Sequence, residues 1–358
     1  MQGEDEVTKH RVTIREVAHK AQVSQQTVSN VINGTGRMSE QTKKRVQSVI
    51  TTLGYHSNRP AQMLRTGHSR MIGITVPRFD QPFCSLFCDC VAQYAHQEGY
   101  GLVVSVFGDN FEETIKETYQ LNADGWIFFA DATILRRIRH LKQDYPVVLA
   151  GDYLGDGELD AVMMPNVDAS RYATNWLIEH SDGHVGMIGA SFETYEQDAK
   201  DPDPIPQRLR HTRDRNTDMR LHGYLLALQD HAIQPDWTII RPVRKLIEAE
   251  GERATEMLLQ TGDVPTGIIC ANDALALGAL STLSKHHISI PEQIQVIGFD
   301  NTRESHYSSP PLSTVDPYVM QYAQLAVQQL IARIEGSSEE VHVLTTGYRL
   351  VERHTTIQ

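Results

Sequence analysis

Apolar residues at helical spacing open the chain. Val17, Ala18 and Ala21 fall on one face of a short helix. Thr13 at its start, with Glu16 three residues later, has the pattern of a capping box, in which each side chain satisfies a free backbone N–H group. Only two residues separate this helix from the next helical segment, so the sequence predicts a tight turn between them.

A second helix is predicted from Gln25 to about Ile32, with Ser24 as its N-cap. Val28, Val31 and Ile32 form its predicted buried side. The predicted exposed side carries amides and hydroxyls, the groups that can hydrogen-bond base edges in the major groove of DNA. These residues are Gln25, Gln26, Thr27, Ser29 and Asn30.

A third helix is predicted after Ser39, where Val46, Val49, Ile50 and Leu53 recur at helical spacing. A helix, a tight turn and a second helix form the helix-turn-helix unit. This segment therefore predicts a DNA-binding module, with a module that docks another protein as the alternative.

Beyond residue 70, short apolar runs alternate with amphipathic segments such as Pro82–Gly99 and Glu112–Asn122. Near-continuous apolar runs are typical of strands in parallel sheets that helices cover on both faces. The runs form two series, 71–76, 102–106, 126–129 and 147–150, then 184–188, 238–241, 266–270 and 295–298. Two such series predict two doubly wound α/β lobes.

Charge separates the two parts of the chain. The whole chain has a formal net charge of −12. Residues 7–68, however, carry ten Lys and Arg against two acids, a net charge of +8, whereas residues 69–358 carry 23 basic and 40 acidic residues. A small basic head on a large acidic body favours a module that contacts phosphates, with a solvated basic face as the alternative.

The composition also restricts the location. No apolar run is long enough to span a membrane, and the first ten residues contain no apolar signal core. The four cysteines are too few for a disulfide framework, so we expect them to be reduced thiols. We therefore expect a cytoplasmic, nucleoid-associated protein with no membrane partner.

Two stretches of the sequence carry a family resemblance. The run from Val12 to Asn33 resembles the signature of the LacI/GalR family of bacterial transcription regulators, and the run from Gly54 to Leu64 resembles the hinge of that family. The resemblance covers essentially the whole chain. It implies an all-α helix-turn-helix head joined by a hinge to an α/β two-lobed core like that of type I periplasmic binding proteins.

The resemblance also implies how the chain is divided. We expect a flexible N-terminus (1–10), a helix-turn-helix domain (11–56), a hinge (57–69) and an effector-binding and dimerisation core (70–358). Lobe 1 is expected at about 70–166 and 318–345, and lobe 2 at about 167–317 and 346–358.

By resemblance the protein is a homodimeric repressor that binds near-palindromic double-stranded operator DNA, and a small effector, expected to be a saccharide, controls that binding. In the family a Leu of the hinge wedges into the central base step, and Leu64 stands at that position, with Ala61 at the close contact between hinges. The implied DNA-binding residues are Thr13, Ser24, Gln25, Gln26, Thr27, Ser29, Asn30, Asn33, Tyr55, Asn58, Arg59, Ala61 and Leu64.

Three positions depart from the family pattern. Gln22 replaces the usual Gly, so a left-handed turn there would cost about 1 kcal/mol. Ser57 replaces the usual Pro, and Asn30 replaces the usual Arg. Because an amide fits adenine N6 and N7 whereas Arg fits guanine, Asn30 predicts a half-site richer in A·T than the common operator of the family. The alternative is that Asn30 is too short to reach a base and bonds only phosphate or water.

The effector is expected between the lobes, at the carboxyl ends of the strands. Carboxylates, Asn and Arg can hydrogen-bond vicinal hydroxyls, and an aromatic ring offers a face to a sugar. The residues implied by resemblance are Phe79, Asp80, Phe83, Asp152, Arg220, Asn272, Asp273 and Asp300. Asp273 could instead serve only as a helix cap.

The other candidate features predict less. Cys84, Cys88 and Cys90 do not share one helix face, so buried thiols are favoured over a metal site. Residues 192–216 are polar and broken by proline, which predicts an exposed loop or lid. No catalytic motif is visible, so we expect neither an enzyme nor a cofactor. A solute-binding protein of a transporter is the alternative, but it would need a signal peptide and would lack the basic head.

Overall fold

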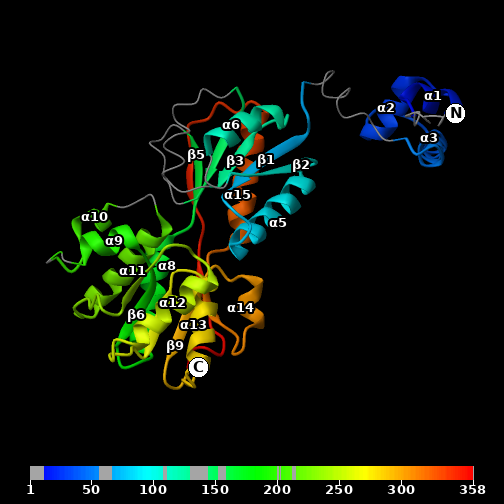
Figure 1. Cartoon of the computed structure of the whole chain (residues 1–358). Helices are drawn as coiled ribbons and strands as arrows, with labels where there is room; N and C mark the ends of the chain where they lie inside the picture. The colour runs from blue at the N-terminus through cyan, green and yellow to red at the C-terminus, as the bar shows by residue number, and fades with distance from the viewer. Residues whose placement is uncertain are drawn as a thin grey trace, which may run out of the picture. The chain divides into compact units, whose positions relative to one another are not determined.

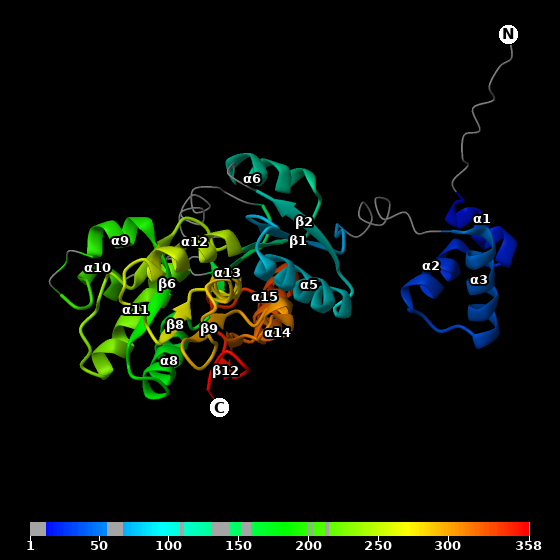
Figure 2. The same cartoon turned by 60° about the horizontal axis from the view of Figure 1, so that its bottom comes forward.

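The computed structural model describes residues 12–55, 67–107, 111–129, 144–151, 159–199, 201, 203–211 and 215–357. The chain divides after Ser69 into two compact units, which we call the head (residues 1–69) and the core (residues 70–358). Figures 1 and 2 show the helices and strands of each unit.

The described part of the head folds into α1 (Ile14–Ala21), α2 (Gln25–Asn33) and α3 (Glu40–Leu53). The Thr13 hydroxyl accepts a hydrogen bond from the Glu16 backbone N–H at 3.4 Å, and the Glu16 carboxylate accepts one from the Thr13 N–H at 2.7 Å. Ser24 and Ser39 each accept from the backbone N–H three residues further on. All three predicted N-caps are therefore confirmed.

The exposure of two residues on α2 differs from the prediction. Ser29 is buried, with 8% of its surface exposed, whereas Ile32 is 38% exposed. The apolar positions that contact α1 and α3 are Val28 and Val31, so the buried face turns toward Ser29 and leaves Ile32 at its edge. The predicted exposure of Ser29 and the predicted burial of Ile32 are both wrong.

The first sheet of the core, sheet A, has the strand order β11-β5-β4-β3-β1-β2 with parallel pairing throughout. Its strands are β1 (Met71–Val76), β2 (Gly101–Val106), β3 (Trp126–Phe129), β4 (Val147–Ala150), β5 (Asp160–Met163) and β11 (Val343–Thr345). Helices α5 (Pro82–Gln97) and α15 (Val319–Ile334) pack together on one face, and α6 (Phe111–Gln120) lies beside β2 (Figure 1).

The second sheet, sheet B, has the order β12-β10-β9-β8-β6-β7, parallel except where β12 pairs antiparallel with β10. Its strands are β6 (Val185–Ser191), β7 (Ile240–Val243), β8 (Gly267–Cys270), β9 (Gln295–Phe299), β10 (Ser313–Asp316) and β12 (Arg349–Val351). Two helix pairs accompany it, α8 (Asn166–Glu179) with α11 (Asn216–Asp230), and α12 (Glu248–Leu259) with α13 (Asp273–Lys285). The short α14 (Arg303–Tyr307) follows β9.

The chain passes between the two sheets more than once. After sheet B is nearly complete, α15 and β11 return to sheet A, and β12 then joins sheet B. The core thus consists of two lobes, each built on one mostly parallel sheet, which is the predicted fold class.

The segment predicted as an exposed loop is folded. Its described residues form α9 (Phe192–Asp198) and α10 (Gln207–Arg210), and Ile205 and Leu209 are buried in the apolar core of sheet B. The Arg208 guanidinium binds the Asp198 carboxylate at 3.0 Å and the Asp218 carboxylate at 3.3 Å. The prediction of an exposed loop is therefore wrong, because buried apolar residues and ion pairs attach this segment to lobe 2.

Gln22 takes the left-handed conformation that its position predicts. It ends α1 with φ 53° and ψ 48°, and its N–H group bonds to the carbonyls of the last turn. A residue with a Cβ atom is strained by about 1 kcal/mol in this conformation, and glycine is not.

We therefore predict that Gln22→Gly raises the free energy of opening α1 by about 1 kcal/mol, because the clash of the Cβ atom is removed. Amide hydrogen exchange of α1 in the full-length protein measures this free energy. Gln47→Gly is the matched control, since Gln47 is exposed in the middle of α3, where glycine should destabilise the helix by roughly 0.5–1 kcal/mol. Unchanged exchange in the Gln22→Gly protein would contradict the prediction.

Candidate functional site: a DNA-binding head and an effector site in lobe 2

The recognition helix α2 presents amide side chains. Gln25 and Gln26 are exposed, whereas Thr27 and Asn30 are half-buried. The Gln26 side-chain amide donates a hydrogen bond to the Asn30 carbonyl oxygen Oδ1 at 2.9 Å. Exposed amides on the second helix of a helix-turn-helix unit can form bidentate hydrogen bonds with bases.

The other predicted DNA contacts are distributed over the head. Thr13 and Ser24 are exposed at the starts of α1 and α2, and Tyr55 packs against the head core. Of the predicted residues, Asn58, Arg59, Ala61 and Leu64 lie outside the described part of the chain, as does the side chain of Asn33.

Cations surround the helices of the head. Exposed basic side chains lie on α1, in the loop after α2 and on α3; they are Arg15, Lys20, Arg37, Lys44 and Arg45. Exposed cations on three segments of a small unit can bind phosphates of the DNA backbone.

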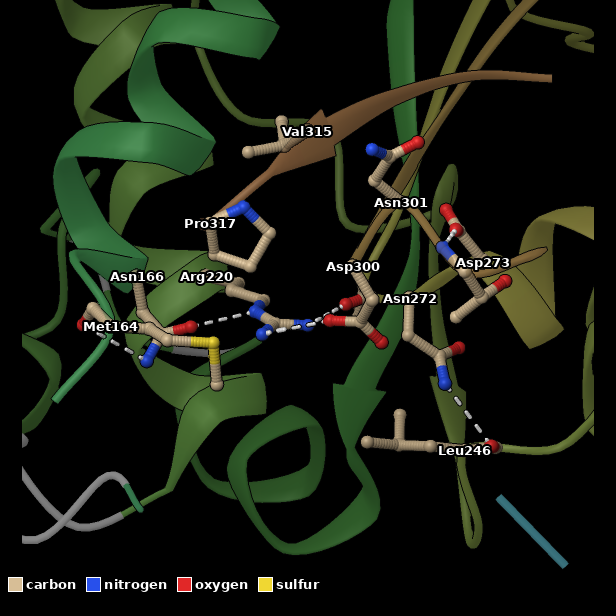
Figure 3. A network of polar contacts seen from close by, with 12 residues as sticks. Met164, Asn166, Arg220, Leu246, Asn272, Asp273, Asp300, Asn301, Val315 and Pro317 are labelled. Carbon is tan, nitrogen blue, oxygen red and sulfur yellow. Dashed lines mark hydrogen bonds and ion pairs between the residues drawn. The ribbon is translucent and has the colours of Figure 1, made fainter. Parts of the chain in front are cut away.

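In lobe 2, Arg220 is the centre of the candidate effector site (Figure 3). Its side chain is 3% exposed, projects from α11 and lies over the Phe299 ring at 3.6 Å. Its guanidinium donates to Asn166 Oδ1 at 2.8 Å and to the Ala271 carbonyl oxygen, and lies 3.5 Å from Asp300 Oδ1. The arginine is thus held in one orientation by the ends of several elements.

Asp300 follows β9 in a strained backbone conformation. Its φ angle is 111°, and the next residue, Asn301, has a φ angle of 50°. Two consecutive non-glycine residues with positive φ cost free energy and persist only where the surroundings enforce them. Such strain is typical of functional sites, and here it directs the Asp300 carboxylate toward Arg220.

Asn272 and Asp273 have different environments. Asn272 caps α13 by accepting from the Leu275 N–H at 2.9 Å, and its amide donates to the Leu246 carbonyl oxygen. The Asp273 carboxylate is fully buried, accepts from the Thr302 N–H at 2.7 Å and from the Thr314 hydroxyl, and burial raises its pKa to about 6. Because protein donors occupy Asp273, it has a structural role and does not belong to our proposed effector contacts.

The residues predicted in lobe 1 follow β1. Phe79 is 51% exposed, and Asp80 pairs with Arg78 at 2.9 Å near the surface. Phe83, at the start of α5, is buried against Phe129 and is therefore part of the lobe 1 core. Of the described residues of this group, Phe79 and Asp80 are therefore exposed to a ligand, and the predicted Asp152 lies outside the described residues.

A cavity of about 500 Å³ lies beside Asp300. Residues from both lobes line it, including Tyr94 of α5 in lobe 1 and Asp316, the last residue of β10 in sheet B. Its volume is within the range of small-molecule sites.

Asn166 is a residue of the site that the sequence did not indicate. It lies at the start of α8, directly after β5, a strand that the apolar runs did not predict because Asp160 begins it. Recognising β5 would have placed Asn166 at a strand's carboxyl end, where ligand-binding residues occur.

The cysteines are buried free thiols in the structure. All four are buried, and burial raises the pKa of Cys84 to about 12 and the pKa values of Cys88 and Cys90 to about 11. The charges of Asp300 and Asp80 also raise the pKa of Cys84.

Within the described ranges, no helix has the length and apolar character needed to cross a membrane.

Comparison with known proteins identifies both parts of the chain. The profile of bacterial regulatory proteins of the lacI family matches residues 13–58, and that of a periplasmic binding protein-like domain matches residues 207–356. The chain is 29% identical over 353 residues to the HTH-type transcriptional repressor PurR of Vibrio atlanticus, covering 96% of this chain and 98% of that repressor.

Solved structures of transcription regulators also resemble this chain. A LacI-type transcription regulator from Bifidobacterium animalis subsp. lactis is 34% identical with a TM-score of 0.73, and the match covers 80% of this chain and 100% of that one. The lac repressor bound to ONPG has the same fold, with a TM-score of 0.77 at 24% identity over 97% of this chain and 100% of that one. The chain therefore belongs to the LacI family of DNA-binding transcription regulators.

Proposed function

We propose that two copies of this chain form a repressor in the bacterial cytoplasm, and that a polyhydroxylated effector, a saccharide, binds at Arg220 and controls its affinity for a near-palindromic operator. The observation that carries the effector proposal is the buried guanidinium of Arg220 beside the strained Asp300. Together a cation donor and a carboxylate acceptor can bond to neighbouring hydroxyl groups in both directions.

The exposed apolar residues of β2 support the homodimer. This strand is an edge of sheet A, and its Val104 and Val106 are 39% and 46% exposed. An exposed edge with apolar side chains is a site for association. A second copy would also provide the second head that a palindromic operator requires.

A thermal-shift screen tests the effector class. Monosaccharides and oligosaccharides are compared with nucleobases and amino acids, because a ligand that binds only the folded state raises the melting temperature by mass action. Stabilisation by a saccharide supports the proposal, and stabilisation only by a compound without hydroxyl groups contradicts it.

Arg220→Lys and Asp300→Asn should each weaken binding of the effector about ten- to a hundredfold, because a hydrogen bond to a charged group contributes roughly 1.5–3 kcal/mol. Operator affinity without effector should stay within a few-fold of wild type. Calorimetric titration with the ligand from the screen measures the first value, and fluorescence anisotropy with operator DNA the second. Arg333→Lys, which alters an ion pair with Asp160 in lobe 1, is the control. If both variants bound the effector as tightly as the wild type does, Arg220 and Asp300 would be excluded from the effector site.

Operator affinity should fall log-linearly with salt, with a slope of about 0.9 for each phosphate neutralised. Arg37→Gln, in the loop after α2, should reduce the slope by about two such units, because it removes one exposed cation from each of the two heads of the dimer. Lys285→Gln, in the core, should leave the slope unchanged, since Lys285 pairs with Glu252. Affinity that does not depend on salt would show that the basic head does not contact DNA.

The double variant Val104→Lys/Val106→Lys should be monomeric at concentrations where the wild type is dimeric, because charges would replace apolar contacts at the β2 edge. Sedimentation velocity measures the mass. Met257→Lys is the control, since Met257 is similarly exposed on α12 of lobe 2. A Val104→Lys/Val106→Lys protein that sediments as a dimer would place the interface elsewhere.

A further inference from the structure

Asn30 has a hydrogen-bond partner on one side and a close backbone neighbour on the other. Its carbonyl oxygen Oδ1 accepts the hydrogen bond from the Gln26 amide one turn earlier on α2, at 2.9 Å. Its amide nitrogen Nδ2 lies against Gly36 in the loop after α2, where the Cβ atom of any other residue would approach to 2.8 Å. Gly36 also has a φ angle of 82°, so it is suited to this loop both by conformation and by space.

The Gln26 side chain is more accessible to DNA than that of Asn30. It is exposed, whereas Asn30 is half-buried. A glutamine amide has two N–H donors and one carbonyl oxygen. One donor is used on Asn30, which leaves the second donor and the oxygen Oε1 for DNA.

These contacts determine the polarity of the Gln26 amide. Because Asn30 offers an oxygen to it, the nitrogen of Gln26 lies next to Asn30 and the oxygen Oε1 lies on the other side. The free N–H and Oε1 form the donor–acceptor pair that binds adenine N7 and N6. If the acceptor on Asn30 were lost, the amide could rotate and this pattern would no longer be fixed.

We propose that Asn30 does not read a base itself but is a positioning residue that orients Gln26 to read adenine, and that Gly36 keeps Asn30 in place. This inference rests on the proposed binding of operator DNA by α2. It replaces the expectation from the sequence alone, in which Asn30 contacts adenine directly. Asn30 then determines specificity at the base pair that Gln26 contacts.

The first test is selection of binding sites from random duplexes by the full-length protein and its variants. Gln26→Ala should lose the adenine preference at one base pair per half-site, by about five- to 150-fold, the range for a bidentate base contact. Asn30→Ala should weaken the preference at that same base pair at least threefold, and the double variant should lose no more than Gln26→Ala. Gln25→Ala is the matched control, since Gln25 is an exposed amide on the same turn; its effect should add to that of Asn30→Ala.

Asn30→Asp separates positioning from direct readout. The carboxylate still accepts from the Gln26 amide but has no N–H to give to a base. The adenine preference should therefore persist in Asn30→Asp, although repulsion from phosphates lowers affinity for all sequences. Loss of the preference in Asn30→Asp would show that the Asn30 amide nitrogen contacts the base, and would overturn the proposal.

A pair of glycines provides the second test. Gly34 and Gly36 both have positive φ angles, 67° and 82°, so alanine strains the backbone at either position. Only at position 36 does the added Cβ meet Asn30; at position 34 nothing lies within 4 Å. Gly36→Ala should broaden the adenine preference, whereas Gly34→Ala should keep the selected sequence. Circular dichroism confirms that both variants are folded.

The possible failures are distinguishable. A wild-type protein that enriches no sequence would refute the proposed operator binding and this inference together. Enrichment of a near-palindrome by the wild type, with Asn30→Ala and Gln26→Ala affecting different base pairs additively, would overturn only the positioning role. An unchanged preference in Asn30→Ala would overturn it as well.

Discussion

The buried guanidinium of Arg220 is the constraint on which the candidate effector site depends. A charge removed from water is costly unless acceptors surround it, and three separate elements supply them here. Asn166 comes from the start of α8, the Ala271 carbonyl from the end of β8, and Asp300 from the end of β9. The need to satisfy one side chain thus holds the carboxyl edge of sheet B in a defined geometry. A ligand that met this edge would find donors and acceptors already oriented, which reduces the entropy lost on binding.

The strained backbone at Asp300 is held by a second set of hydrogen bonds. A φ angle of 111° is unfavourable for aspartate, and it persists because the following residues are fixed by hydrogen bonds. Asn301 accepts from Arg353 at 2.6 Å and donates its N–H to the Thr314 hydroxyl, which in turn bonds to the buried Asp273. Asp273 therefore contributes to the site without any ligand contact, because it anchors the backbone that directs Asp300 toward Arg220.

The sequence predicted most of the fold because its signals are local. Capping residues and apolar spacing specify the helices of the head, and continuous apolar runs specify the inner strands of both sheets. The failures concern features that depend on tertiary contacts. β5 begins with Asp160, whose charge is compensated by Arg333 from α15, 173 residues later. Residues 192–211 look like a polar loop, yet Arg208 is balanced by Asp198 and by Asp218, which a sequence pattern does not associate with it. Asn166 was missed because β5 was missed.

A related limit of prediction from sequence appears at the recognition helix α2. Residue type alone assigned Asn30 to adenine, since an asparagine amide matches that base. The structure adds that the Asn30 oxygen already accepts a hydrogen bond from Gln26 and that its amide nitrogen lies close to Gly36. Whether a polar side chain is available to a ligand depends on contacts across a turn of helix and a neighbouring loop. The departures at positions 22 and 30 therefore differ in kind. Gln22 costs the head stability at a turn, whereas Asn30, in our proposal, orients the amide that Gln26 presents to the DNA.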